Sequence, residues 1–243
     1  MPGTLYVVST PIGNLEDITS RALRILKEAD AIASENVSTT LKLLARYEIK
    51  KHLISYTEHK WYGPSTPHKF KQQGIIMEKL LNGENIALVS SAGTPLISDP
   101  GYELINKCLA NNIKVVPIPG ACAAVTALSV SGLPTDRFLF EGFLPLKKSK
   151  RHKRLLDANA SNATMVFYES PYRLVKTLKE MRECFGPNRK AVIGRELTKL
   201  YEECIRGTLD EVIARLEKQT VRGECTIAIE KAHNEQSKSA STG

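Results

Sequence analysis

The sequence has few cysteines, and they stand far apart. The five are Cys108, Cys122, Cys184, Cys204 and Cys225, and no two of them form a C-x-x-C pair. An odd, dispersed set argues against a disulfide framework and favours a reducing compartment. The five histidines are equally scattered, so the spacing typical of zinc ligands is absent, and we expect no metal site.

Long hydrophobic runs are also missing. The longest weakly apolar stretch, Ala121 to Val130, is about half as long as a membrane-spanning helix must be. The chain enters a strand-like segment at once, without the charged and apolar stretches of a secretory signal. We therefore expect a cytoplasmic protein with no membrane segment.

Positive charge is in excess. The chain carries 34 Lys and Arg against 26 Asp and Glu, a formal net charge of +8. Such an excess favours an anionic partner but does not identify it. The apolar fraction of 42% is ordinary, and a chain of 243 residues is long enough to bury a sizeable core.

In the first half, short β-branched runs alternate with amphipathic segments. Continuous apolar strands separated by helices indicate a parallel sheet that is covered on both faces. Thr19 or Ser20 is the expected cap of the first helix, and Gly83 is placed to end the third. The expected strands are 5–9, 31–34, 53–56, 86–90 and 115–118, and the expected helices are 20–30, 38–47, 68–82 and 101–111.

The pattern changes after Gly120. The expected helices are now 121–131, 149–159, 171–185 and 208–218, and the expected strands are 138–143, 165–168, 190–195, 201–206 and 225–230. Strands 190–195 and 201–206 are joined too briefly for a parallel crossover, so they should pair antiparallel. The sequence thus predicts two α/β domains, 1–119 and 120–233, with a disordered tail at 234–243.

Three glycine- and proline-rich loops follow predicted strands of the first domain. They are 10–14 (TPIGN), 90–101 (SSAGTPLISDPG) and 117–123 (PIPGACA). Ligands of open parallel sheets bind outside the carboxyl ends of the strands, so one crevice is expected to collect all three loops. The G-x-G-x-x-G and P-loop motifs are missing, which disfavours the usual dinucleotide and nucleotide sites. From the residues alone, tight turns and a ligand pocket both remain open.

The motifs identify a resemblance. LYVVSTPIGNLEDIT, SSAGTPLISDPGY, VVPIPG, SGLPTDRFLFEGFLP, FYESPYR, RELTK and RGTL occur in the order found in the ribosomal RNA small-subunit (cytidine-2′-O)-methyltransferases. The chain resembles that family from about Leu5 to Lys231. This implies the tetrapyrrole-methylase fold of class III methyltransferases and a homodimer. It also implies S-adenosyl-methionine in a cleft between the domains and a cytidine ribose of 16S ribosomal RNA in the small subunit as substrate.

The resemblance also implies a set of cofactor-binding residues. These are Pro11, Ser91, Gly93, Thr94, Ile97, Ala121, Cys122, Ala123, Tyr168 and Leu197.

Three motifs depart from the family pattern. The family reads A-E-D-T-R where this chain has Ser34-Glu35-Asn36-Val37-Ser38, and D-A-G-T-P where it has Ser91 to Pro95. Its G-P-S-A is Gly120-Ala121-Cys122-Ala123. Two carboxylates and one arginine are therefore missing from functional motifs, although Glu35 remains. The family's C-terminal helical extension is also not recognised, and we expect weaker RNA capture without it.

Methylation of a ribose hydroxyl requires in-line alignment and help with loss of the hydroxyl proton. The residues that could give this help follow predicted strands, and for each carboxylate a helix cap or surface ion pair is an alternative at least as strong. The candidates are Glu35, Glu169, Arg195, Glu196 and Lys199.

The segment 147–154 holds six Lys or Arg in eight residues. A charge run is often just a solvated helix face, but phosphate contacts by such cations would position RNA without reading its sequence. The predicted RNA contacts are Lys147, Lys148, Lys150, Arg151, Lys153, Arg154 and Arg173. Trp61 and Tyr62 are candidates for base stacking or for simple loop anchors.

Two other functions remain open from the sequence. A methyltransferase of the same fold could act on a tetrapyrrole or another small molecule, although a macrocycle needs no phosphate-binding surface. A catalytically weakened relative could bind cofactor and ribosomal RNA without efficient turnover, as the changes at Asn36, Ser38 and Ser91 suggest.

Overall fold

A computed structural model of the chain describes residues 1–58 and 67–232. It divides into two compact units, Met1–Cys122 and Ala123–Gly243. The division falls slightly after the predicted boundary at 119/120, because Ala121 still bonds to a loop of the first unit. The predicted tail at 234–243 and the candidates Trp61 and Tyr62 lie outside the described residues.

The first unit is built on a parallel sheet of five strands in the order β3-β2-β4-β1-β5. The strands are β1 (Thr4–Val8), β2 (Ala31–Ser34), β3 (His52–Ser55), β4 (Ile86–Val89) and β5 (Lys114–Ile118). All four residues of β2 and of β4 are buried, which explains why seven of these eight residues are apolar.

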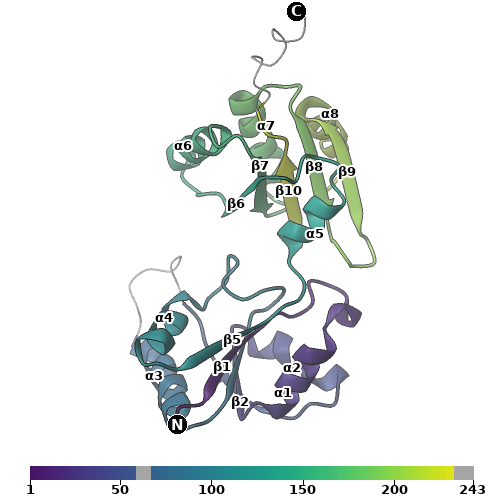
Figure 1. Ribbon diagram of the computed structural model, residues 1–243. Coiled ribbons are helices and arrows are strands. Elements are labelled where there is room, and N and C mark those ends of the chain that lie inside the picture. The colour runs from purple at the N-terminus through teal and green to yellow at the C-terminus, as the bar shows by residue number, and fades with distance from the viewer. Residues whose placement is uncertain (59–66, 233–243) are drawn as a thin grey trace, which may run out of the picture. The chain divides into compact units, whose positions relative to one another are not determined.

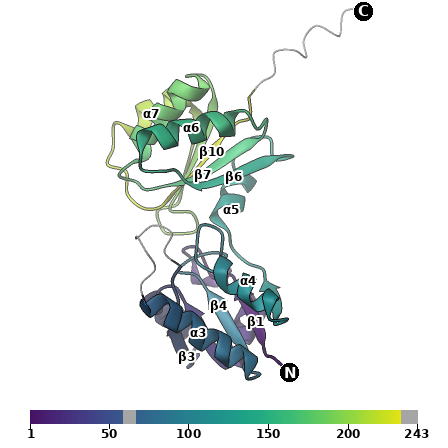
Figure 2. The ribbon, with the colours of Figure 1, turned by 90° about the vertical axis from the view of Figure 1, so that its left-hand side faces the viewer.

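Helices cover both faces of this sheet (Figures 1 and 2). They are α1 (Ser20–Glu28), α2 (Val37–Arg46), α3 (Pro67–Leu81) and α4 (Tyr102–Ala110), and a short 3₁₀ helix, η1 (Leu15–Asp17), precedes α1. Successive residues of β4 point to opposite faces. Leu88 therefore packs in the cluster that includes residues of α3 and α4, and Ala87 in the cluster that includes residues of α1 and α2.

The predicted helix ends of the first unit are present. The hydroxyl of Thr19 accepts a hydrogen bond from the amide of Ala22, which caps α1. The side chain of Asn36 caps α2 in the same way, although Asn36 was not among the predicted helix ends. Gly83 follows α3 with φ of 93°, a conformation that glycine adopts without steric cost.

The second unit holds a mixed sheet of five strands in the order β6-β7-β10-β8-β9. The strands are β6 (Phe138–Phe143), β7 (Thr164–Glu169), β8 (Lys190–Arg195), β9 (Glu203–Thr208) and β10 (Cys225–Ile229). β6 and β7 run parallel, whereas β10 runs antiparallel to both of its neighbours. β8 and β9 also pair antiparallel, as their short connection predicts.

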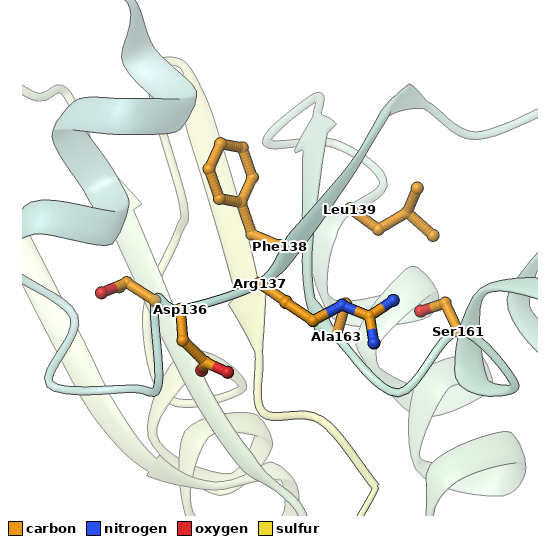
Figure 3. Close-up of a pocket in the computed structure, with 7 residues that line it drawn as sticks. Asp136, Arg137, Phe138, Leu139, Ser161 and Ala163 are labelled. Atoms are coloured by element: carbon orange, nitrogen blue, oxygen red, sulfur yellow. The ribbon is translucent and has the colours of Figure 1, made fainter.

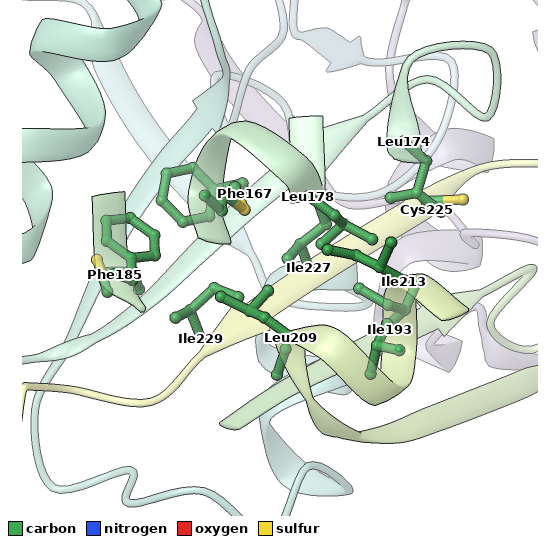
Figure 4. Packing of buried hydrophobic residues seen from close by; sticks show 14 of the residues in the cluster. Phe167, Leu174, Leu178, Phe185, Ile193, Leu209, Ile213, Cys225, Ile227 and Ile229 are labelled. Carbon is green, nitrogen blue, oxygen red and sulfur yellow. The ribbon is translucent and has the colours of Figure 1, made fainter. Parts of the chain in front are cut away.

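The core of the second unit lies between this sheet and three helices, α6 (Lys148–Asn159), α7 (Leu174–Phe185) and α8 (Leu209–Leu216). Phe167, Leu178 and Ile227 are fully buried there (Figure 4). A fourth helix, α5 (Ala123–Ser129), packs against β7 and β10 through its buried residues. In residues 1–58 and 67–232, no helix is both long and apolar enough to cross a membrane.

The predicted α/β class with two sheets is confirmed, and most elements end within two residues of the predicted positions. Several helices are shorter than predicted. The predicted helix 121–131 spans only Ala123–Ser129, and the predicted helix 171–185 begins at Leu174 because the Pro171 segment forms a turn. β9 is shifted by two residues from its predicted position, and Glu196 and Thr198 adopt left-handed conformations in the loop before it.

Candidate active site

The three loops singled out in the sequence meet at one edge of the first sheet. They follow β1, β4 and β5, which are adjacent strands, so their carboxyl ends lie together. Thr10 and Gly93 exchange two backbone hydrogen bonds of 2.8 and 3.1 Å. The hydroxyl of Thr94 lies 2.9 Å from that of Ser9 and donates to the carbonyl of Ala121 at 3.0 Å. The Thr94 side chain thus joins the loop after β4 to the loop after β5 and to Ser9, the residue just before the first loop.

Glycine is needed where these loops pack most closely. A Cβ atom at Gly120 would lie 2.8 Å from the Cβ atom of Ser9, too close for real side chains. The loop after β4 also holds two non-glycine residues in the left-handed region, Leu96 at φ 74° and Ser98 at φ 72°. Such backbone strain persists only when the surroundings hold it, and it occurs often at ligand sites.

Glu35 lies at this loop cluster, at the carboxyl end of β2. Its carboxylate accepts a hydrogen bond of 2.9 Å from the amide of Ser91 and another from the Ser91 hydroxyl. The Ser91 position is one where the resembling family carries a carboxylate. The serine hydroxyl instead supplies a donor, so a second negative charge is not placed against Glu35 at this contact.

Asp99 is a residue that the sequence reasoning missed. Burial and, second, the nearby charge of Glu35 raise the pKa of Asp99 to about 7, against a weaker opposing hydrogen bond from Ser90. A carboxyl group with such a pKa suits proton transfer near neutral pH. The sequence places Asp99 in the SSAGTPLISDPG loop, and this was the only signal that it belongs to the site. Its burial beside Glu35 could not be predicted, because it depends on the fold.

The predicted cofactor residues divide between the two units. Pro11, Ser91, Gly93, Thr94, Ile97, Ala121 and Cys122 belong to the loop cluster of the first unit, and Ala123, Tyr168 and Leu197 to the second. In the second unit, the Tyr168 hydroxyl accepts a hydrogen bond of 3.2 Å from the amide of Ala124, beside Ala123. Leu197 is buried against Gly194. Their role in cofactor binding stays a prediction.

Glu169 is buried among fixed partners in the second unit. It accepts hydrogen bonds from the Ser170 amide at 2.8 Å and the Thr177 hydroxyl at 2.7 Å, and it pairs with Arg173 at 3.2 Å. These contacts tie the end of β7 to the start of α7. Glu169 therefore has the structural role that the sequence left open beside catalysis.

Arg195, Glu196 and Lys199 form a network in and beside the loop between β8 and β9. The guanidinium of Arg195 pairs with Glu203 at 2.9 Å. The ammonium of Lys199 lies 2.9 Å from both Glu196 and Glu224. Burial alone would lower the pKa of Lys199, but the hydrogen bonds to these two carboxylates outweigh it and raise the pKa. Lys199 is thus held protonated, so it serves poorly as a base.

The basic segment begins α6, and most of its cations are exposed. Lys147, Lys148, Lys150, Lys153 and Arg154 face solvent, although Arg154 also pairs with Glu141. The prediction that Arg151 contacts RNA is contradicted, because the side chain of Arg151 is buried. It forms two hydrogen bonds of 2.6 Å with Glu180 on α7 and donates to two backbone carbonyls. Arg151 therefore fixes α6 to the unit.

The i, i+4, i+7 spacing of Arg151, Leu155 and Ala158, which are the buried residues of α6, was a sequence signal for this inward position. Arg173 likewise serves an internal role, because it pairs with Glu169 and donates to the carbonyl of Leu144 at 3.3 Å. Its prediction as an RNA contact loses support, since both contacts hold its guanidinium through Nη2 against the protein.

A separate open hollow of about 400 Å³ lies at the start of β6 (Figure 3). Arg137, Phe138 and Ser161 are among its lining residues. Its members were not among the predicted site residues. Across residues 1–58 and 67–232, no cluster of three or more His, Cys, Asp or Glu side chains is placed to hold a metal ion.

The sequence profile of the Tetrapyrrole (Corrin/Porphyrin) Methylases matches residues 4–213. A protein of Halalkalibacterium halodurans named Ribosomal RNA small subunit methyltransferase I is 50% identical over 94% of this chain and 76% of its own length. The protein of that name from Bacillus subtilis is 47% identical over 96% of this chain and 77% of its own length.

Solved structures show the same fold. Uroporphyrin-III C-methyl transferase from Thermus thermophilus, complexed with S-adenosyl homocysteine, superposes with a TM-score of 0.65 at 18% identity. The match covers 94% of this chain and 97% of that one. With the loop cluster and the family match, the chain belongs to the tetrapyrrole methylase family, in the group of the ribosomal RNA small subunit methyltransferases.

Proposed function

We propose that this protein transfers a methyl group from S-adenosyl-methionine to a ribose 2′-hydroxyl of a cytidine in 16S ribosomal RNA. The observation that carries the proposal is the 50% identity, over 94% of the chain, to a protein named for methylation of small-subunit ribosomal RNA. The choice of cytidine and of the 2′-hydroxyl rests on the motif resemblance. The exposed cations of α6 support an RNA substrate over a small molecule.

The loop cluster of the first unit has the chemistry to hold S-adenosyl-methionine. Its third loop combines small side chains with partial exposure of Pro119 to Cys122, so a flat ligand can approach the chain there. When bound, the cofactor supplies an activated methyl group on a positively charged sulfur. Carboxyl groups at Glu35 and Asp99 make the same edge favourable for positive charge.

Among the predicted catalytic residues, Glu35 lies at the loop cluster. Its hydrogen bonds to Ser91 fix the orientation of the carboxylate, and Asp99 adds a carboxyl group that titrates near neutral pH. We propose that this pair, in place of the buried Glu169 or the protonated Lys199, assists removal of the hydroxyl proton. Arg195 stays a predicted site residue, and its ion pair with Glu203 does not indicate a catalytic role.

The resemblance supports a homodimer, and the dispersed cysteines and histidines support a reducing compartment and the absence of a metal site. We propose a homodimer that acts in the cytoplasm and needs no bound metal ion. Light scattering of the purified protein measures whether it is a dimer. Activity in the presence of a chelator measures whether the protein needs a bound metal ion. A full loss of activity that Mg²⁺ alone does not restore would contradict the proposal that it needs none.

The function is tested with methyl-labelled S-adenosyl-methionine and small ribosomal subunits from cells that lack this modification. We expect label in the ribosomal RNA and none in an added tetrapyrrole such as uroporphyrinogen III. Label in the tetrapyrrole alone would favour the small-molecule alternative. Cofactor binding without transfer to either substrate would favour the catalytically weakened relative.

A further inference from the structure

The end of β6 presents an aromatic surface whose position depends on a β-bulge. The register between β6 and β7 shifts between Phe140 and Gly142, which leaves Glu141 as an extra residue. In a regular strand, residues three apart point to opposite faces of the sheet. The bulge changes this alternation, so Phe140 and Phe143 both contact the ring of Tyr168.

These ring contacts hold Phe143 in place without burying it. Its ring packs edge-on against Tyr168 with centroids 5.6 Å apart and an angle of 62°. The Tyr168 hydroxyl is in turn bonded to the Ala124 amide. Phe143 nevertheless stays 50% exposed. A fixed aromatic ring with one open face is the kind of group on which a nucleobase stacks.

A second aromatic residue lies on the neighbouring segment. Tyr172 follows β7 and is 96% exposed, which is unusual for so large a side chain. The adjacent Arg173 donates to the carbonyl of Leu144, the residue after Phe143, at 3.3 Å. That bond holds the Tyr172 turn next to the end of β6.

Exposed cations adjoin this surface along the chain. Lys147, Lys148 and Lys150 begin four residues after Phe143, and Arg151 fixes their helix by donating to the carbonyls of Pro145 and Leu146. Aromatic rings beside a positively charged helix start match the bases and phosphates of a single-stranded nucleic acid. The RNA substrate proposed above supplies both bases and phosphates, so we favour it over an acidic protein or a membrane.

We propose that Phe143 and Tyr172 form a base-stacking surface that positions single-stranded RNA next to the lysines of α6. This inference rests on the proposed function, and it assigns the two side chains to substrate positioning. The surface would hold nucleotides of the RNA in a splayed, unpaired conformation. Because stacking does not read base edges, it gives affinity and geometry, and sequence choice must come from elsewhere.

The test compares the wild type with Phe143→Leu, Tyr172→Leu and the double variant. Phe143→Trp and Tyr172→Phe keep an aromatic ring, and Leu109→Ala changes an exposed apolar residue of the first unit as a matched control. Fluorescence anisotropy measures binding of a labelled single-stranded RNA oligonucleotide. Kinetics on undermethylated small subunits give KM and kcat, and calorimetry gives the affinity for S-adenosyl-methionine.

We expect the double leucine variant to bind RNA at least about tenfold more weakly, with a raised KM and an unchanged cofactor affinity. The ring-keeping variants and Leu109→Ala should stay near the wild type. Equal RNA binding by the double leucine variant would overturn the inference. So would a loss shared by the ring-keeping variants, or a change of oligomeric state that shows the surface to be a contact between copies of the chain.

Failure of the proposed function has a different signature. In that case the wild type itself would not methylate small subunits. The oligonucleotide measurement would still decide the inference, because it requires no turnover.

Discussion

At the scale of single residues, the most informative feature is that similar side chains have different roles. Among the cations of α6, Arg151 is 4% exposed and bonded to Glu180, whereas Lys150 beside it faces solvent. Hydrogen bonds with Glu180 raise the pKa of Arg151, and the same bonds lower the pKa of Glu180. The pair is therefore charged at neutral pH, and each partner compensates for the burial of the other.

Arg151→Ala is expected to lower the free energy of unfolding by about 3–5 kcal/mol, because it leaves the Glu180 carboxylate buried without its partner. Lys150→Ala should change stability by less than about 0.5 kcal/mol while it weakens RNA binding. Urea denaturation of both variants measures the free energy of unfolding, and fluorescence anisotropy with labelled RNA measures the binding affinity. The division of roles is wrong if Arg151→Ala is as stable as the wild type and loses only RNA affinity.

Asp99 gives a pH-dependent prediction. Its pKa rises from 3.8 to about 7 in the folded protein, so the folded state binds the proton more tightly than the unfolded state. The stability that Asp99 contributes is therefore lost as pH rises from about 4 to about 7. Asp99→Asn should be more stable than the wild type at pH 8, on the order of 2 kcal/mol after discounting for partial exposure, with a gain that shrinks toward pH 4.

Thermal unfolding of both proteins across this pH range measures the effect. A constant difference between them from pH 4 to pH 8 would show that Asp99 does not titrate as described. The same variant reports on chemistry, because a group that exchanges a proton with substrate should also alter the pH profile of methyl transfer.

At the scale of elements, the altered segment after β2 has a structural explanation. Asn36 accepts hydrogen bonds from the amides of Ser38 and Thr39 at 3.1 and 3.2 Å, and the Ser38 hydroxyl donates to it at 2.8 Å. The departure from the family pattern thus keeps a well-formed cap on α2. The fold does not depend on the carboxylate that the family carries there.

Asn36→Ala should lower the free energy of unfolding by about 1 kcal/mol, because it removes the cap of α2. Asn36→Asp should stay within a few tenths of a kcal/mol of the wild type, since aspartate caps as well as asparagine. Urea denaturation of the two variants measures the difference. Equal loss in both would mean that the cap is not what Asn36 contributes.

The pair Asn36→Asp and Ser38→Arg then tests whether the chain is a weakened relative. An active enzyme should gain little methyl transfer from restoring the family residues. A large gain would show that the natural sequence is impaired.

Much of the element order followed from the sequence because local signals are strong here. Apolar runs such as 86–89 mark buried strands, and Thr19 and Gly83 mark helix ends by local chemistry. The side chains that decide function were harder to predict. Glu169 and Arg151 find their partners only after β7, α6 and α7 pack, and the burial that raises the pKa of Asp99 likewise needs the fold.

At the scale of the whole molecule, the net charge of +8 becomes meaningful through its placement. Three exposed lysines, Lys147, Lys148 and Lys150, stand at the start of one helix. Neutralised phosphates release counterions, so binding through these lysines must weaken as salt rises.

Replacing the three lysines with alanine should weaken RNA binding and flatten its salt dependence. With a contribution of about 0.7 per phosphate contact on a single strand, the slope of log K against log salt should fall in magnitude by about 2. Anisotropy titrations at several salt concentrations measure the slope. An unchanged slope would place the RNA on another surface of the protein.

The central claim is that the protein methylates one ribose of small-subunit ribosomal RNA. The most direct measurement is mass spectrometry of nuclease-digested RNA, after reaction of the wild-type protein with S-adenosyl-methionine and undermethylated small subunits. We expect 2′-O-methylcytidine at a single position. A methyl group on a base, or intact subunits left unmethylated while a related enzyme modifies them, would contradict it.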